Sequence, residues 1–102
     1  MLEPFYCPTS VAVIGASRDE TKLGHAVVKN LLECGYRGRI YPINLKNDEI
    51  LGLQAYPSVL TVPGDIELAV VVVPERFVAA VLEECGQKGV RGVVVILSLI
   101  HI

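Results

Sequence analysis

Short uncharged runs of apolar residues alternate along this chain with segments in which apolar residues recur every three or four positions. The runs are typical of strands buried on both faces of a parallel sheet, and the spaced segments are typical of helices. Helical spacing begins at Leu23 and again at Glu75, each time after an apolar run. The pattern therefore predicts an α/β domain with strands at residues 11–14, 39–43, 68–73 and 92–97.

Glycine and proline residues mark the ends of the predicted helices. Gly35 is placed to cap the first helix at its C-terminus, and Pro74 suits the first turn of the second, predicted at 75–85. Residues 86–89 contain two glycines and end that helix. We expect the helices to pack on the sheet through Leu23, Val27, Leu31 and Leu32, and through Phe77, Val78, Val81 and Leu82.

The order of these elements predicts a doubly wound parallel sheet, a Rossmann-like arrangement with the first strand in the middle. A short edge strand at 53–56, followed by a brief helix or turn at 57–60, would lie on the side of the second strand. The strand at 68–73 would lie on the other side. Because ligands bind where the strand order reverses, the crevice should lie between the loops after Ile14 and Val73.

The segment 10–25 contains the first predicted strand, a glycine turn and the start of the first helix. Gly15 ends the strand, and Ala16 and Ser17 are small enough to let a ligand approach the backbone. The N-terminus of a helix offers unpaired N–H groups and partial positive charge. A phosphate-bearing ligand is therefore the leading interpretation, and a βα junction that binds nothing is the alternative.

The charges ahead of the helix point to the same ligand class. Arg18 and Lys22 precede the helix, where positive charge is unfavourable unless an anion offsets it. A bound phosphate would provide that anion. The carboxylates of Asp19 and Glu20 could offset the charge instead.

The sequence lacks the dinucleotide fingerprint G-x-G-x-x-G, because the next glycine after Gly15 is Gly24. No acidic residue ends the second strand; Lys46 follows it instead, and a lysine there suits a phosphorylated ribose better than a free diol. Coenzyme A (CoA), with its 3′-phosphate, and NADP both meet that requirement. A solvated loop lysine is the alternative interpretation of Lys46.

Composition narrows the classes of partner. With 102 residues the chain forms one domain at most, and its net charge of −2 argues against nucleic acid. Cys7, Cys34 and Cys85 suggest neither disulfides nor a zinc site; we interpret the last two as small core residues. The longest apolar run is too short for a membrane helix, and no signal peptide is evident. We expect a cytoplasmic protein.

Taken together in this order, several motifs give the chain a resemblance to a known family. Residues 5–97 are similar to the N-terminal CoA-binding domain of NDP-forming acyl-CoA synthetases. That family includes ADP-forming acetate–CoA ligase, the succinyl-CoA synthetase α subunit and acyltransferases that acetylate protein lysines. The motifs are SVAVIGAS at 10–17, LGH at 23–25, GRIYPIN at 38–44, LGL at 51–53 and VVVP at 71–74.

The resemblance implies that CoA is the ligand. The loop after the first strand would hold its phosphates, Lys46 would meet the nucleotide end, and Val73 and Pro74 would border the pantetheine. Leu45 departs from the family, which usually has proline there. The candidate cofactor-binding residues are Gly15, Ala16, Ser17, Arg18, Lys22, Gly24, His25, Asn44, Lys46, Val73 and Pro74.

The resemblance also implies partners: the ATP-grasp and phosphohistidine-bearing domains or subunit of the same synthetase. We predict no catalytic and no metal-binding residue in this chain, so it should bind CoA without turnover. The alternatives are the NADP-binding domain of an oxidoreductase and a stand-alone CoA- or nucleotide-sensing domain.

The predicted organisation is an N-terminal arm at 1–9, a CoA-binding domain at 10–97 and an atypical tail at 98–102. The tail departs from the family pattern, so we expect the fold to be incomplete at the C-terminus. Apolar surface on the last strand would then lack cover. Lower stability or self-association is the expected consequence.

Overall fold

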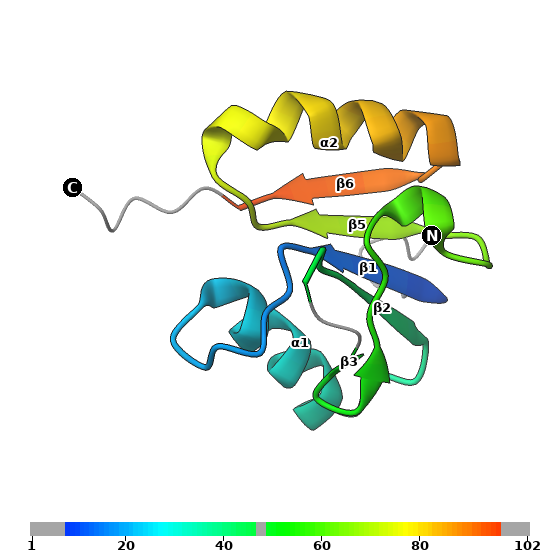
Figure 1. The fold of residues 1–102 in the computed structure, drawn as a ribbon. Helices are drawn as coiled ribbons and strands as arrows, with labels where there is room; N and C mark the ends of the chain where they lie inside the picture. Colours follow the sequence, from blue (N-terminus) through cyan, green and yellow to red (C-terminus); the bar gives the residue numbers. More distant parts are fainter. Residues whose placement is uncertain (1–7, 47–48, 97–102) are drawn as a thin grey trace.

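A parallel sheet of four strands forms the centre of the molecule, in the order β2-β1-β5-β6 (Figure 1). The structure is a computed structural model that describes residues 8–46 and 49–96. β1 pairs with β2 and with β5, as expected for a central first strand. The predicted parallel sheet is confirmed, with strands β1 (Ser10–Ile14), β2 (Arg39–Ile43), β5 (Leu68–Val71) and β6 (Gly92–Val95).

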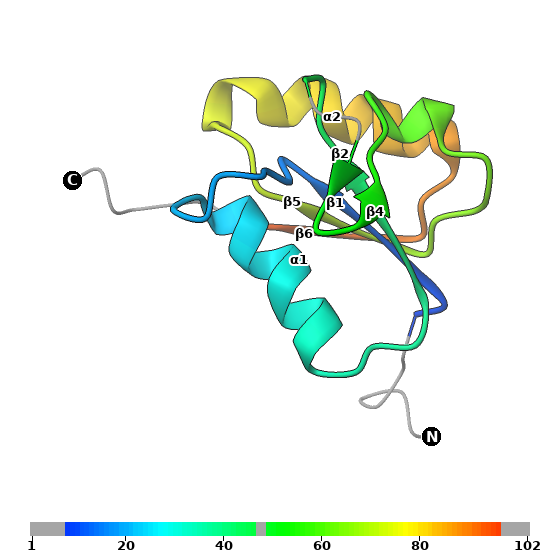
Figure 2. The ribbon, with the colours of Figure 1, turned by 60° about the horizontal axis from the view of Figure 1, so that its bottom comes forward.

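One helix covers each face of the sheet, so the doubly wound arrangement is also confirmed (Figures 1 and 2). α1 (Leu23–Glu33) packs Val28 against Val11 and Val13 of β1. α2 (Glu75–Lys88) packs Cys85 into the opposite cluster, which contains Ala12. Since successive side chains of a strand point to opposite faces, β1 supplies both clusters and is buried along its whole length.

The two helices present only some of the expected residues to the sheet. Val27, Leu31 and Val81 pack against the core clusters as predicted. Leu23 and Leu32 of α1 and Phe77 and Leu82 of α2 are exposed, so the prediction is wrong for these four. α1 instead buries Gly24, His25 and Val28, and α2 faces the sheet with Val81 and Cys85. The small size of Gly24 lets the start of α1 lie directly against the loop after β1.

The positions of the helix ends and the burial of the cysteines can be compared with the predictions. Gly35 follows α1 with a φ of 82° and Gly89 ends α2 with a φ of 86°, both in the left-handed region that favours glycine. α2 runs three residues beyond the predicted Cys85. Cys85 is buried, and burial raises the pKa of its thiol. Cys34 is exposed just after α1 and is not a core residue, contrary to expectation.

The segment after β2 does not form a strand of the central sheet. β3 (Glu49–Ile50) and β4 (Leu53–Gln54) pair as a separate antiparallel hairpin, and only Tyr56 bridges to the end of β2. Leu51 and Gly52 at its turn both have positive φ, the geometry of a two-residue hairpin turn. The predicted edge strand at 53–56 is therefore confirmed only at Tyr56, which pairs with β2, and is wrong at Leu53 and Gln54, which pair within the hairpin. The brief helix expected next is present as the 3-10 helix η2 (Val59–Thr61).

β6 is the edge strand of the described sheet, and the side chains of its three valines are exposed to solvent. Val93, Val94 and Val95 are 38%, 47% and 38% exposed. β5 and β6 end two residues earlier than predicted, although Val72 and Ile96 continue the ladder by one hydrogen bond each. Residues 1–7 of the predicted arm at 1–9 and the whole tail at 98–102 lie outside the described residues.

We expect this edge to make the 102-residue chain self-associate, because an uncharged edge strand with exposed valines can pair with another copy. Sedimentation velocity should show a weight-average mass that rises with concentration. Val94→Lys should shift the chain toward monomer, whereas Ala79→Lys on the exposed side of α2 should not. A sample that stays monomeric at all concentrations would contradict the prediction.

Candidate functional site

The carboxyl ends of β1, β2 and β5 converge at one edge of the sheet. The Val72 N–H donates to the Ile14 carbonyl at 2.8 Å, and the Gly15 N–H donates to the Ile43 carbonyl at 3.2 Å. A β carbon on Gly15 would lie only 2.1 Å from the Val72 carbonyl oxygen. The loops after Ile14 and Val73 therefore meet where the strand order reverses, as predicted.

The loop after β1 offers hydrogen-bond donors to this edge. Among the described residues, the backbone N–H groups of Ala16, Ser17 and Arg18 have no acceptor. Gly15 turns the chain with a φ of 99° just before them. Consecutive free N–H groups in a turn are donors of the kind that an anion accepts, so the loop suits a phosphate.

The N-terminus of α1 adds to that potential. Lys22 is its N-cap residue and makes no side-chain capping hydrogen bond, and the first turn contains no acidic residue. The first N–H groups of the helix are therefore available, and the positive end of its dipole is unopposed within the helix. Both properties favour an anion at this position.

Asp19 is engaged within the loop and does not cap the helix. Its Oδ1 accepts hydrogen bonds from the Thr21 hydroxyl at 2.6 Å and from the Thr21 N–H at 2.9 Å. These hydrogen bonds, with a smaller contribution from the positive charge of Lys22, hold the pKa of the Asp19 carboxyl below its usual range. Asp19 thus supplies a fixed negative charge near Lys22, and it offsets part of the positive charge as the sequence suggested.

Gly24 and His25 join α1 to the loop. A β carbon on Gly24 would lie 1.9 Å from the Gly15 carbonyl oxygen, so the helix touches the loop backbone. The buried His25 ring places Nδ1 2.9 Å from the Ser17 carbonyl oxygen. Because a carbonyl only accepts, Nδ1 carries the proton in this contact. Both predicted site residues hold the shape of the loop.

Asn44 and Arg18 connect the loop after β1 to the segment after β2. The Asn44 Nδ2 donates to the Ala16 carbonyl at 2.7 Å, and its Oδ1 accepts from the Lys46 N–H at 2.6 Å. The Arg18 Nε donates to the Glu49 carbonyl at 2.7 Å. Sequence reasoning missed these links. The signal that could have revealed the Asn44 turn is an asparagine just after a strand end, because its side chain readily bonds the backbone N–H two residues on.

The remaining predicted residues border the same edge. Lys22, Lys46 and Pro74 are exposed, and Val73 is half-buried beside the α2 core cluster. Pro74 is the N-cap of α2, one position before the first turn in which it was expected. The structure thus places the predicted residues in the segments that follow the ends of three neighbouring strands.

This edge presents the free N–H groups of the loop at 16–18 and the first N–H groups of α1. Two cavities of the described part of the chain lie elsewhere, one beside β2 and one near Pro8 and Glu67. Within residues 8–46 and 49–96, no cluster of three or more histidine, cysteine, aspartate or glutamate residues could hold a metal ion. No helix in this part has the length and apolarity needed to cross a membrane.

A comparison with models of known protein families shows which family the chain belongs to. The model of the CoA-binding domain family matches residues 9–101. This chain belongs to that family. Within it, the chain is related to the ADP-forming acetate–CoA ligases, and its Rossmann-like CoA-binding fold is that of known members.

Three relatives illustrate the relationship. The α subunit of acetate–CoA ligase [ADP-forming] II from Pyrococcus furiosus is 52% identical over 96% of this chain, which spans 21% of that subunit. An acetate–CoA ligase [ADP-forming] from Methanocaldococcus jannaschii is 58% identical over 89% of the chain and 13% of the ligase. One similar solved structure is the dinucleotide forming acetyl-coenzyme A synthetase 1 of Ca. Korarchaeum cryptofilum, in complex with phosphate and ADP. It is 44% identical to this chain with a TM-score of 0.90, and the match covers 96% of this chain and 21% of the synthetase chain. The chain therefore spans about a fifth or less of these relatives.

Proposed function

We propose that this chain holds CoA at the edge where β1, β2 and β5 end, as the CoA-binding module of an ADP-forming acyl-CoA synthetase. The observation that carries the proposal is the convergence of two features. Free N–H groups in the loop at 16–18 lie next to an uncapped helix N-terminus, at the point where the strand order reverses. Family membership supports CoA as the anion's carrier.

Each part of the edge has a separate task in this proposal. The loop N–H groups and the start of α1 bind the diphosphate, and the exposed Lys22 adds positive charge. Lys46 meets the 3′-phosphate of the ribose, and Val73 and Pro74 border the pantetheine. CoA supplies a thiol; this chain binds and orients it. The acyl and phosphoryl steps would belong to ATP-grasp and phosphohistidine-bearing domains or subunits, in the cytoplasm.

Titration calorimetry with CoA, dephospho-CoA and NADPH tests the proposal. Lys46→Ala should weaken the binding of CoA by roughly 1 to 2 kcal/mol, because one charge-assisted contact is lost. The binding of dephospho-CoA should stay nearly unchanged. Lys29→Ala is the matched control, since Lys29 lies on the exposed side of α1 and faces Glu33. An equal loss for CoA and dephospho-CoA would remove the role of Lys46.

An NADP-binding module of an oxidoreductase is the second candidate, and the position of Lys46 after β2 favours it. The absence of G-x-G-x-x-G weighs against it. NADPH also carries a ribose phosphate, so only the order of affinities separates the two ligands. Tighter binding of NADPH than of CoA would replace the first proposal with the second.

A further inference from the structure

Two consecutive carbonyl groups of the loop after β1 are each held by a side chain from a different element. The Ala16 carbonyl accepts from the Asn44 Nδ2 at 2.7 Å. The Ser17 carbonyl accepts from the His25 Nδ1 at 2.9 Å. Asn44 follows β2, whereas His25 lies in the first turn of α1. The two contacts therefore fix the planes of two neighbouring peptides in the loop.

The fixed carbonyls determine where two N–H groups of the loop point. The peptide bonds of the described residues are all trans, and in a planar trans peptide the C=O and N–H bonds point in opposite directions. The Ala16 carbonyl shares its peptide with the Ser17 N–H, which therefore points away from Asn44. The Ser17 carbonyl shares its peptide with the Arg18 N–H, which therefore points away from His25. Neither N–H has an acceptor in the described part of the chain.

Both side chains are themselves held in place. The His25 ring is buried, and Asn44 is half-buried with its backbone N–H bonded to the Tyr56 carbonyl at 2.8 Å. The Asn44 Oδ1 also accepts from the Lys46 N–H, so the orientation of its amide is set from both ends. Because Ala16 is buried as well, loss of the Asn44 donor would leave its carbonyl poorly solvated and favour rotation of the peptide.

We propose that Asn44 and His25 are positioning residues that keep the Ser17 and Arg18 N–H groups directed at a bound anion. The inference rests on the proposed function in taking that anion to be the diphosphate of CoA. Rotation of either peptide would replace an N–H that attracts phosphate with a carbonyl oxygen that repels it. Holding the carbonyls from behind removes the cost of ordering the loop when the anion binds. Each side chain thus acts through the loop and needs no contact with the ligand.

Two substitutions of nearly equal shape test the role of His25. His25→Asn keeps a donor, because the asparagine amide nitrogen takes the same position along the side chain as the histidine Nδ1. His25→Leu has a similar shape without the donor. By titration calorimetry, His25→Leu should bind CoA about tenfold more weakly than His25→Asn, since the Ser17 carbonyl loses its partner. Both variants lack the buried ring, so the comparison cancels that loss.

Asn44→Ser tests the other side chain. A serine hydroxyl can still accept from the N–H two residues on, at Lys46, but it is too short to reach the Ala16 carbonyl. CoA and dephospho-CoA should both bind about threefold to tenfold more weakly, by the same factor, because they share the diphosphate. Loss of CoA affinity alone would place the effect at Lys46 and overturn the role of Asn44.

Nuclear magnetic resonance titration of the full chain with inorganic pyrophosphate shows which N–H each side chain controls. Pyrophosphate should shift the amide signals of Ser17 and Arg18 in the unsubstituted chain. His25→Leu should reduce the shift at Arg18 more than at Ser17, and Asn44→Ser should do the reverse. A general loss of stability would reduce both shifts together, so this crossed pattern reports the positioning role.

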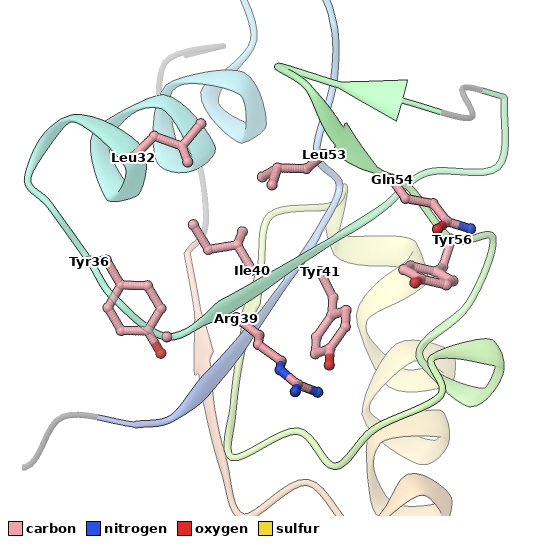
Figure 3. A pocket seen from close by; sticks show the side chains of 9 residues that line it. Leu32, Tyr36, Arg39, Ile40, Tyr41, Leu53, Gln54 and Tyr56 are labelled. Atoms are coloured by element: carbon pink, nitrogen blue, oxygen red, sulfur yellow. The ribbon is translucent and has the colours of Figure 1, made fainter.

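Arg39 provides the internal reference for this titration. It pairs with Ser10 at the opposite end of β1 from the loop, and it lines the separate cavity of about 320 Å³ beside β2 (Figure 3). Its amide should not shift. A shift at Arg39 as large as at Ser17 and Arg18 would mean that pyrophosphate only follows exposed positive charge, and would overturn the proposal.

The proposal also fails if His25→Leu binds CoA as tightly as His25→Asn, or if Ser17 and Arg18 respond equally in both variants. Dispersed amide spectra would confirm that the variants are folded. Such results leave the CoA proposal standing as long as the unsubstituted chain binds CoA. Conversely, the crossed pattern in a chain that does not bind CoA would support the positioning of the two N–H groups and reject CoA as the ligand.

Discussion

Replacing Gly15 with alanine should destabilise the fold by about 2 to 5 kcal/mol, a large part of the total stability of a small domain. Gly15 has a φ of 99°, and the added β carbon would lie 2.1 Å from the Val72 carbonyl oxygen and 2.8 Å from its carbon. Left-handed strain contributes about 1–2 kcal/mol and overpacking about 1–3 kcal/mol. Backbone atoms of two paired strands cannot move apart without breaking the hydrogen bond from Val72 to Ile14. Urea denaturation followed by circular dichroism measures the loss.

Gly35→Ala separates the two contributions. Gly35 also has a positive φ, 82°, but a β carbon there would meet nothing within 4 Å. Only the conformational strain should then appear, about 1–2 kcal/mol. If both variants lose the same stability, contact between the loops after β1 and β5 does not require Gly15.

The central sheet could be predicted because its strands are encoded by local composition. An uncharged run such as 11–14 has few stable alternatives to a strand buried on both faces, and the glycine after it fixes where the strand ends. Alternation with helices then leaves few ways to order four parallel strands. The position of the candidate site follows from that order alone.

The details around the site depend on contacts that local patterns do not contain. Phe77 and Leu82 have the helical spacing of core residues, yet α2 meets the sheet through Val81 and Cys85, because the rotation of a helix is set by what it packs on. The hairpin β3–β4 arises from two left-handed residues at 51 and 52, and one of them is a leucine. Periodicity gives no signal for that turn.

The polar residues of the site also make contacts that the sequence could not predict. The sequence identified Asn44 as a candidate contact for the ligand, and the structure adds that its amide links the Ala16 carbonyl to the Lys46 N–H. Such a link depends on two loops that are 28 residues apart meeting in space. It follows from the fold, so it becomes visible only once the strand order is known.

Gly24→Ala should likewise be strongly destabilising, by about 1 to 3 kcal/mol from overpacking, and should weaken CoA in the molecules that remain folded. The new β carbon would lie 1.9 Å from the Gly15 carbonyl oxygen and 3.1 Å from the Ala16 Cα, so α1 must move away from the loop. That movement separates the helix N-terminus from the loop N–H groups, which are proposed to bind one diphosphate together. Thermal denaturation and CoA titration of the same sample measure both effects.

Gly86→Ala should have the opposite effect on stability, although Gly86 also lies in a helix. A β carbon at Gly86 would meet nothing within 4 Å, so alanine should stabilise α2 by about 0.5–1 kcal/mol and leave CoA binding unchanged. The pair therefore distinguishes a glycine needed for close approach from one that only lowers helix propensity. Unchanged stability and CoA affinity in Gly24→Ala would show that the start of α1 does not rest on the loop after β1, and the shared anion site would then have no structural basis.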